Sequence, residues 1–133
     1  EAELKQFRNI LMERNLLWAG KAPFLAFLFA RRKFNHNGQP NNWAVFDTGA
    51  AWMSLALQAR KMGLYAHAMA GIKKEEAYRI LDVSEEDYEA VIGIAVGRYG
   101  DPQLLPENEL VREKYNMRRD ISDIAVKGLK KTE

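Results

Sequence analysis

The sequence contains no cysteine, which excludes every kind of site that needs a thiol. Disulfide bonds, thiolate nucleophiles and cysteine-bound metals are all ruled out, and such a chain suits a reducing compartment, so we expect a cytoplasmic protein. Histidine is scarce as well, since His36 and His67 are the only two. Neither has a carboxylate at ligand spacing, and the sequence therefore predicts no metal site.

Long apolar runs are also absent. The longest, residues 22–30, is much shorter than the roughly 20 residues that cross a bilayer. The start of the sequence does not show the layout of a signal peptide, which is a basic segment followed by an apolar run and a cleavage site. The sequence therefore predicts no signal peptide. The net charge is only +2, and the basic residues gather in short runs at 31–33 and 130–131, which are typical of solvated segments. We expect neither a membrane nor a nucleic acid as partner.

The sequence also lacks the common catalytic and nucleotide-binding motifs. It has no GxSxG, no GxxxxGK[ST] and no GxGxxG after a strand. Gly93 and Gly97 lie in an apolar run, where glycine is typical of close backbone packing. No nucleophile or acid–base pair is evident, so an enzyme of this sequence needs a bound cofactor to supply its chemistry.

Hydrophobic periodicity predicts strands and helices intermixed along one chain. A domain of 133 residues with this pattern belongs to the α+β class, a sheet with helices packed on it. The run PFLAFLFA is expected to be a central strand, because it is apolar without alternation. Helices are predicted at about 2–19, 43–62, 73–81 and 107–114, strands at 23–30, 64–70 and 88–99, a capped turn at 84–87, and an arm from residue 118.

The helix within FDTGAAWMSLALQARKMGL, residues 46–64, is apolar or small on nearly every side. A surface helix of a single domain normally shows one apolar stripe and one polar face. So short a chain has little interior to cover the other sides, and we expect a partner surface there. Gly63 is predicted to end the helix in a left-handed conformation.

The stretch MAGIKKEE marks a corner at which a short strand ends, a glycine follows and a helix begins. Backbone N–H groups at such a corner can donate to a ligand. A plain tight turn is the alternative interpretation, and spacing alone favours it.

In their order along the chain, several stretches resemble the C-terminal part of the flavin-dependent nitroreductase family. The resemblance covers about residues 9–126, and the segment 46–64 is its most specific part. The matching stretches are NLLWAGKAPFLAFLFA, NNWAVFDTGAAWMSLALQARKMGL, AHAMAGI, LDVSEEDYEAVIGIAVGRYGDP and MRRDISDIAV.

This resemblance implies a nitroreductase-like central sheet flanked by helices, with the long central helix at a homodimer interface. It implies FMN held at that interface and electron transfer from NADH or NADPH to nitroaromatics, quinones or similar small-molecule acceptors. The alternatives are a flavin-binding module without turnover and a dimeric structural or interaction domain without cofactor.

The resemblance also implies flavin-binding roles for particular residues. Ala70 and Gly71 correspond to the position whose backbone N–H lies near the flavin N5 and O4 in the family. Arg118 and Arg119 correspond to the basic residues that contact the FMN phosphate. Many relatives carry Glu where this chain has Ala70, so any polar role of that Glu is missing. Two looser assignments complete the implied site: Asn15 as a flavin contact, and Met69 beside the ring or in the core.

The family's N-terminal segments have no counterpart in this chain. A basic Arg-x-Ser-x-Arg segment grips the FMN phosphate in the family, and an Asn-Gln-Pro-Trp-like segment lines the ring, yet neither precedes Glu1. We therefore expect residues 1–133 to be a single nitroreductase-like domain that is incomplete at the N-terminus and by itself binds FMN weakly.

Overall fold

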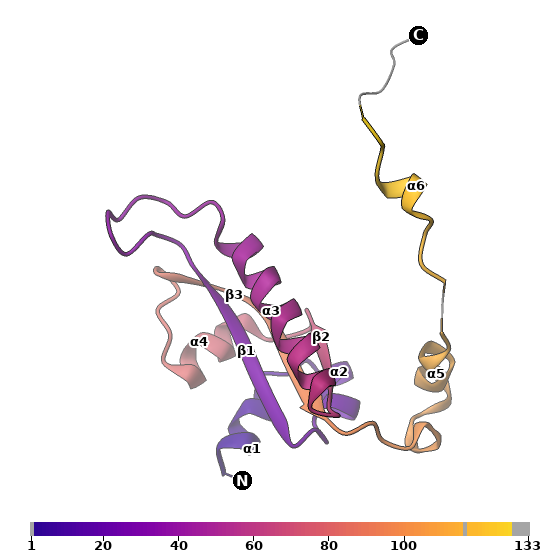
Figure 1. Cartoon of the computed structure of the whole chain (residues 1–133). Helices are drawn as coiled ribbons and strands as arrows, with labels where there is room; N and C mark the ends of the chain where they lie inside the picture. The colour runs from indigo at the N-terminus through magenta and orange to yellow at the C-terminus, as the bar shows by residue number, and fades with distance from the viewer. Residues whose placement is uncertain (1, 116, 129–133) are drawn as a thin grey trace. The chain divides into compact units, whose positions relative to one another are not determined.

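A computed structural model describes residues 2–115 and 117–128 (Figure 1). The chain divides into two compact units, Glu1–Tyr99 and Gly100–Glu133. Helices and strands intermix, so the α+β class predicted from the sequence is confirmed. The basic pair at 130–131 lies outside the described residues.

The first unit contains a three-stranded antiparallel sheet in the order β1-β3-β2. Its strands are β1 (Phe24–Arg31), β2 (Tyr65–Met69) and β3 (Tyr88–Gly97). The expectation that PFLAFLFA is the central strand is wrong for the described sheet, because β3 pairs on both sides and β1 on one. The run is apolar because helices contact both faces of β1.

Three helices cover one face of this sheet and bury the main core. They are α1 (Ala2–Asn9), α2 (Glu13–Ala19) and α4 (Lys74–Leu81) (Figure 1). Their apolar positions meet inward-facing residues of all three strands, which removes apolar surface from water. The buried residues of this cluster are Ile10, Leu11, Ala19, Leu25, Met69, Ile72, Ala77, Ala90 and Ala95.

The long helix α3 (Ala44–Lys61) lies along the opposite face of the sheet and contacts all three strands. It occupies the span predicted from the sequence, and Gly63 follows it with a φ of +74°, as expected of glycine there. Only Ala44, Thr48 and Ala59 of this helix are buried. No helix among the described residues is long and apolar enough to cross a membrane.

The single helix predicted over residues 2–19 is broken in the middle. The chain leaves α1 after Asn9, and Leu11 forms an antiparallel bridge with Ile72. Next to this bridge, the Lys73 N–H donates to the Ile10 carbonyl at 2.8 Å. Ile10 and Leu11 are almost fully buried, so packing against the distant segment at 72–73 overrides the local helical pattern.

The second unit consists of short elements without a core of their own. They are η1 (Pro102–Leu104), α5 (Glu107–Leu110), η2 (Val111–Glu113) and α6 (Ile121–Ile124). The helix predicted at 107–114 is thus one α-helical turn followed by a 3₁₀ turn. Among the residues described in this unit none is buried, and large apolar side chains stand exposed at Leu104, Val111, Tyr115, Met117, Ile121, Ile124 and Val126.

Candidate functional site

The corner after β2 is held by backbone pairing with the segment between α1 and α2. Beside the bridge between Leu11 and Ile72, the Met12 N–H donates to the Gly71 carbonyl at 3.1 Å. The Ile72 N–H closes a tight turn by donating to the Ala70 carbonyl at 2.9 Å. The two segments therefore form a short second ladder beside the main sheet, and this ladder fixes the path of residues 70–73.

Asn15 reaches this corner from the first turn of α2. Its side-chain Nδ2 donates to the Gly71 carbonyl at 2.9 Å. The approach is so close that a Cβ at position 71 would lie 2.5 Å from that same nitrogen, so the Asn15 amide would have to shift if another residue stood there. The structure thus brings together Asn15 and Gly71, two residues that the sequence proposed separately.

The carbonyl of Gly71 is hydrogen-bonded, whereas for the N–H of the same residue no hydrogen-bond partner is found within the described part of the chain. Gly71 is only half-buried, and Ala70 beside it is exposed. A backbone N–H in such a place can donate to an acceptor atom of a ligand without breaking an existing bond.

The three remaining candidates have different surroundings. Met69 is 5% exposed and belongs to the core cluster, which agrees with the core-packing alternative for this residue. Arg118 and Arg119 lie in the second unit, in the extended segment before α6, and both are exposed. Exposed guanidinium groups with free donors are suited to bind phosphate.

Apolar side chains surround the corner on the α2 side. Met12 is 51% exposed, and its Sδ would lie 3.7 Å from a Cβ at Gly71. Leu16, one turn further along the helix, is 42% exposed. Trp18 packs against His67 with ring centroids 4.6 Å apart and ring planes tilted by 55°, so this histidine has a packing role. Exposed apolar groups beside an unpaired donor suit a flat ring with a polar edge.

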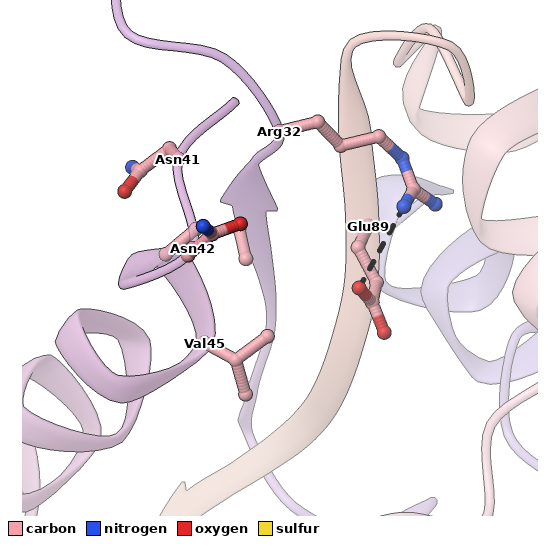
Figure 2. A pocket seen from close by; sticks show the side chains of 7 residues that line it. Arg32, Asn41, Asn42, Val45 and Glu89 are labelled. Atoms are coloured by element: carbon pink, nitrogen blue, oxygen red, sulfur yellow. Dashed lines mark ion pairs between the residues drawn. The ribbon is translucent and has the colours of Figure 1, made fainter. Parts of the chain in front are cut away.

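A separate polar pocket, which the sequence did not predict, opens at the start of α3 (Figure 2). It has a volume of about 290 Å³, and its polar lining consists of Arg32, Asn41, Asn42 and Glu89. Arg32 pairs with Glu89 at 3.7 Å, and its Nε donates at 3.2 Å to two backbone carbonyls near the start of β3. Arg32 is exposed, as expected of a solvated run, and in addition forms these surface bonds.

Acidic and histidine side chains do not gather into a metal site in this part of the molecule. Among the described residues, no group of three or more His, Cys, Asp or Glu side chains is placed to hold a metal ion. The donors that the structure shows at the corner are the Gly71 N–H and the Asn15 amide.

Solved structures similar to this chain share its fold. An oxidoreductase containing FMN is 35% identical, with a TM-score of 0.90 over 97% of this chain and 66% of its own. The enone reductase CLA-ER, from a gut-bacterial fatty acid saturation metabolism, is 18% identical, with a TM-score of 0.70 over 96% of this chain and 72% of its own. A nitroreductase family protein from Streptococcus pneumoniae TIGR4 is 15% identical, with a TM-score of 0.67 over 95% and 74%.

The chain spans just under two thirds of the first of these proteins, and the other two likenesses concern the fold alone. None of the curated proteins matches the sequence. The family model described as "Nitroreductase family" matches residues 1–98, which include the whole sheet, α3 and the corner at Gly71. The chain belongs to the nitroreductase family.

Proposed function

We propose that this chain is part of an FMN-dependent oxidoreductase that transfers electrons from NAD(P)H to a nitroaromatic, quinone or similar acceptor. The observation that carries the proposal is the Gly71 N–H, which has no partner in the described chain and lies at the corner where the family's flavin donor is expected. The similar oxidoreductase that contains FMN supports the choice of cofactor. NADH or NADPH as the electron donor is in keeping with a cytoplasmic protein.

The residues at the corner fit a flavin ring. Gly71 offers one backbone donor to the electron-accepting edge, and Ala70 adds no bulk beside it. Met12 and Leu16 offer apolar surface against which a ring can pack. Bound FMN would supply the redox chemistry, because it takes up electrons from a nicotinamide and passes them on. The protein's own contribution is to bind, to orient and to donate one hydrogen bond.

Phosphate binding falls to the arginines of the second unit in this proposal. Arg118 and Arg119 present guanidinium groups whose paired donors match phosphate oxygens. Two guanidinium groups suit this role better than one, since a dianionic phosphate needs several donors to replace its water.

The proposed assembly is a homodimer that buries the outer side of α3. This helix exposes Val45, Phe46, Met53 and Leu57, although each is a large apolar side chain. Trp43, immediately before it, is 66% exposed. An apolar surface of this kind on one long helix fits an isologous interface, in which the same face of both subunits is used.

The proposal is tested with the full-length protein after reconstitution with FMN. We expect the protein to purify or reconstitute as a yellow complex, and NADH or NADPH added without oxygen should bleach the flavin absorbance. A quinone or nitroaromatic should then restore the colour. Binding without bleaching would identify a flavin-binding module, and a colourless dimer that ignores FMN would identify a structural domain.

A further inference from the structure

The Gly71 carbonyl receives two hydrogen bonds, and both come from the start of α2. Met12 donates its backbone N–H at 3.1 Å, and Asn15 donates its side-chain Nδ2 at 2.9 Å. A carbonyl oxygen has two lone pairs, so both are used. The peptide that joins Gly71 to Ile72 is therefore held from one side by a single short segment.

The two donors also form one rigid unit. The Asn15 N–H donates to the Met12 carbonyl at 2.9 Å, so the residue that reaches Gly71 by its side chain is itself bonded to the residue that reaches Gly71 by its backbone. Glycine has the widest backbone freedom of any residue, and bonds from outside must fix its orientation. At position 71, Met12 and Asn15 hold the peptide that follows the residue, and the Ile72 N–H, which donates to the Ala70 carbonyl at 2.9 Å, holds the peptide that precedes it.

We infer that Asn15 is a positioning residue: it holds the Gly71–Ile72 peptide, whose Ile72 N–H in turn holds the Ala70 carbonyl and so fixes the direction of the Gly71 N–H in the same peptide. This inference rests on the proposed function, in which that N–H donates to the electron-accepting edge of the flavin ring. Asn15 then acts through Gly71 and not by its own contact with the cofactor. One N–H of its amide is engaged with Gly71 at 2.9 Å, and a Cβ on Gly71 would displace that nitrogen.

The first test asks whether the bond exists in solution, and it needs no flavin. In the full-length apoprotein, Asn15→Leu removes the donor while keeping a side chain of similar size. We expect the carbonyl ¹³C resonance of Gly71 to shift upfield, because that carbonyl loses one of its two donors. Asn9→Leu is the matched control, since Asn9 is exposed at the end of α1, and it should leave the resonance unchanged.

The second test measures flavin affinity. Asn15→Leu should weaken FMN and riboflavin by the same factor of about tenfold, because the bond acts on the ring end and both ligands share the ring. In the FMN complex, hydrogen exchange of the Gly71 amide should become faster by a similar factor. A loss confined to FMN would show that Asn15 serves the phosphate, and would overturn the inference.

A third variant tests whether the side chain at position 15 acts by donating a hydrogen bond or by its shape alone. In Asn15→Asp the ionised carboxylate cannot donate to a carbonyl, whereas the protonated acid can. Riboflavin affinity relative to the wild type should therefore be low at neutral pH and recover as the pH falls through the pKa of the new carboxyl. Riboflavin is the probe because it has no phosphate to titrate. A relative affinity that does not change with pH would contradict the inference.

The outcomes distinguish this inference from the proposed function. Wild-type protein that binds neither FMN nor riboflavin would overturn both. Wild-type protein that binds flavin, combined with an unshifted Gly71 resonance or an undiminished affinity in Asn15→Leu, would overturn the inference alone. A shifted resonance together with equal losses for the two ligands would support it.

Discussion

A Cβ atom placed on Gly71 would lie 2.5 Å from the Nδ2 of Asn15, although 56 positions separate the two residues. No real Cβ contact is so short, so the Asn15 side chain must move if Gly71 becomes any other residue. The φ of Gly71 is not positive, and the need for glycine therefore comes from this neighbour and not from backbone strain.

Gly71→Ala is expected to break the hydrogen bond from Asn15 and to lower the free energy of unfolding by about 1 kcal/mol. Urea denaturation of the full-length protein measures the change. Gly100→Ala is the matched control, since no heavy atom lies within 4 Å of a Cβ there, and it should stay within about 0.5 kcal/mol of the wild type. In an Asn15→Ala background, Gly71→Ala should have a smaller effect; equal effects in both backgrounds would show that the two positions do not interact.

Tyr78 connects α4 to the start of β3 by two hydrogen bonds. Its hydroxyl oxygen accepts from the Ala90 N–H at 2.8 Å, and the hydroxyl donates to the Tyr88 carbonyl at 3.3 Å. Ala90 is 1% exposed, so water cannot readily replace the lost acceptor in Tyr78→Phe. We expect this variant to lose about 1–3 kcal/mol of stability in urea denaturation.

The control for Tyr78 is Tyr88→Phe. The Tyr88 hydroxyl accepts only an exposed bond of 3.4 Å from Arg31, so its removal should change stability by less than about 0.5 kcal/mol. Equal losses in the two variants would mean that the buried N–H of Ala90 adds nothing to the cost of removing an exposed hydroxyl.

The proposed dimer predicts opposite effects for apolar residues on the two faces of the sheet. Phe46 and Leu57 on α3 are 74% and 64% exposed, so a charge at either place should leave the single subunit folded. Phe46→Asp or Leu57→Glu should instead convert the dimer to monomer in light scattering, because the partner would bury an unpaired charge. Leu17→Glu on α2, an equally exposed site on the other face, should remain dimeric. Monomers produced only by Leu17→Glu would place the interface on α2.

Local chemistry explains most of what the sequence predicted correctly. Gly63 ends α3 because glycine adopts a positive φ easily, and Ser84 caps its turn by accepting from the Asp87 N–H at 3.2 Å. Each of these features depends on residues a few positions apart, so their spacing is visible in the sequence. The span of α3 follows for the same reason, since its long apolar pattern persists whatever packs beside it.

Contacts between distant segments explain what the sequence did not predict. The break between α1 and α2 depends on the pairing of Leu11 with Ile72, and the role of Arg32 depends on its pairing with Glu89. Both pairings join distant segments, so no pattern within one segment of the sequence indicates them. The bond from Asn15 to Gly71 is of the same kind. The resemblance proposed both residues as flavin contacts, but only the fold shows that one of them holds the other.

The last prediction concerns the phosphate of FMN. If Arg118 and Arg119 bind it, changing both to Ala in the full-length protein removes charge-assisted hydrogen bonds of about 1.5–3 kcal/mol each, which corresponds to at least tenfold weaker FMN binding. Riboflavin lacks the phosphate, so its affinity should change far less. This pattern differs from the one expected for Asn15→Leu, in which the affinities for FMN and riboflavin fall by the same factor.

Fluorescence titration of FMN and riboflavin against the wild type and the double variant measures both affinities. The two side chains are exposed, so their replacement should leave the fold intact, and the far-ultraviolet circular dichroism should not change. Arg118→Lys with Arg119→Lys is the matched control: it retains the charge but lacks the planar fork, and it should recover part of the affinity for FMN. An equal loss of FMN and riboflavin in the Ala variant would show that these arginines support the folded structure and not the phosphate.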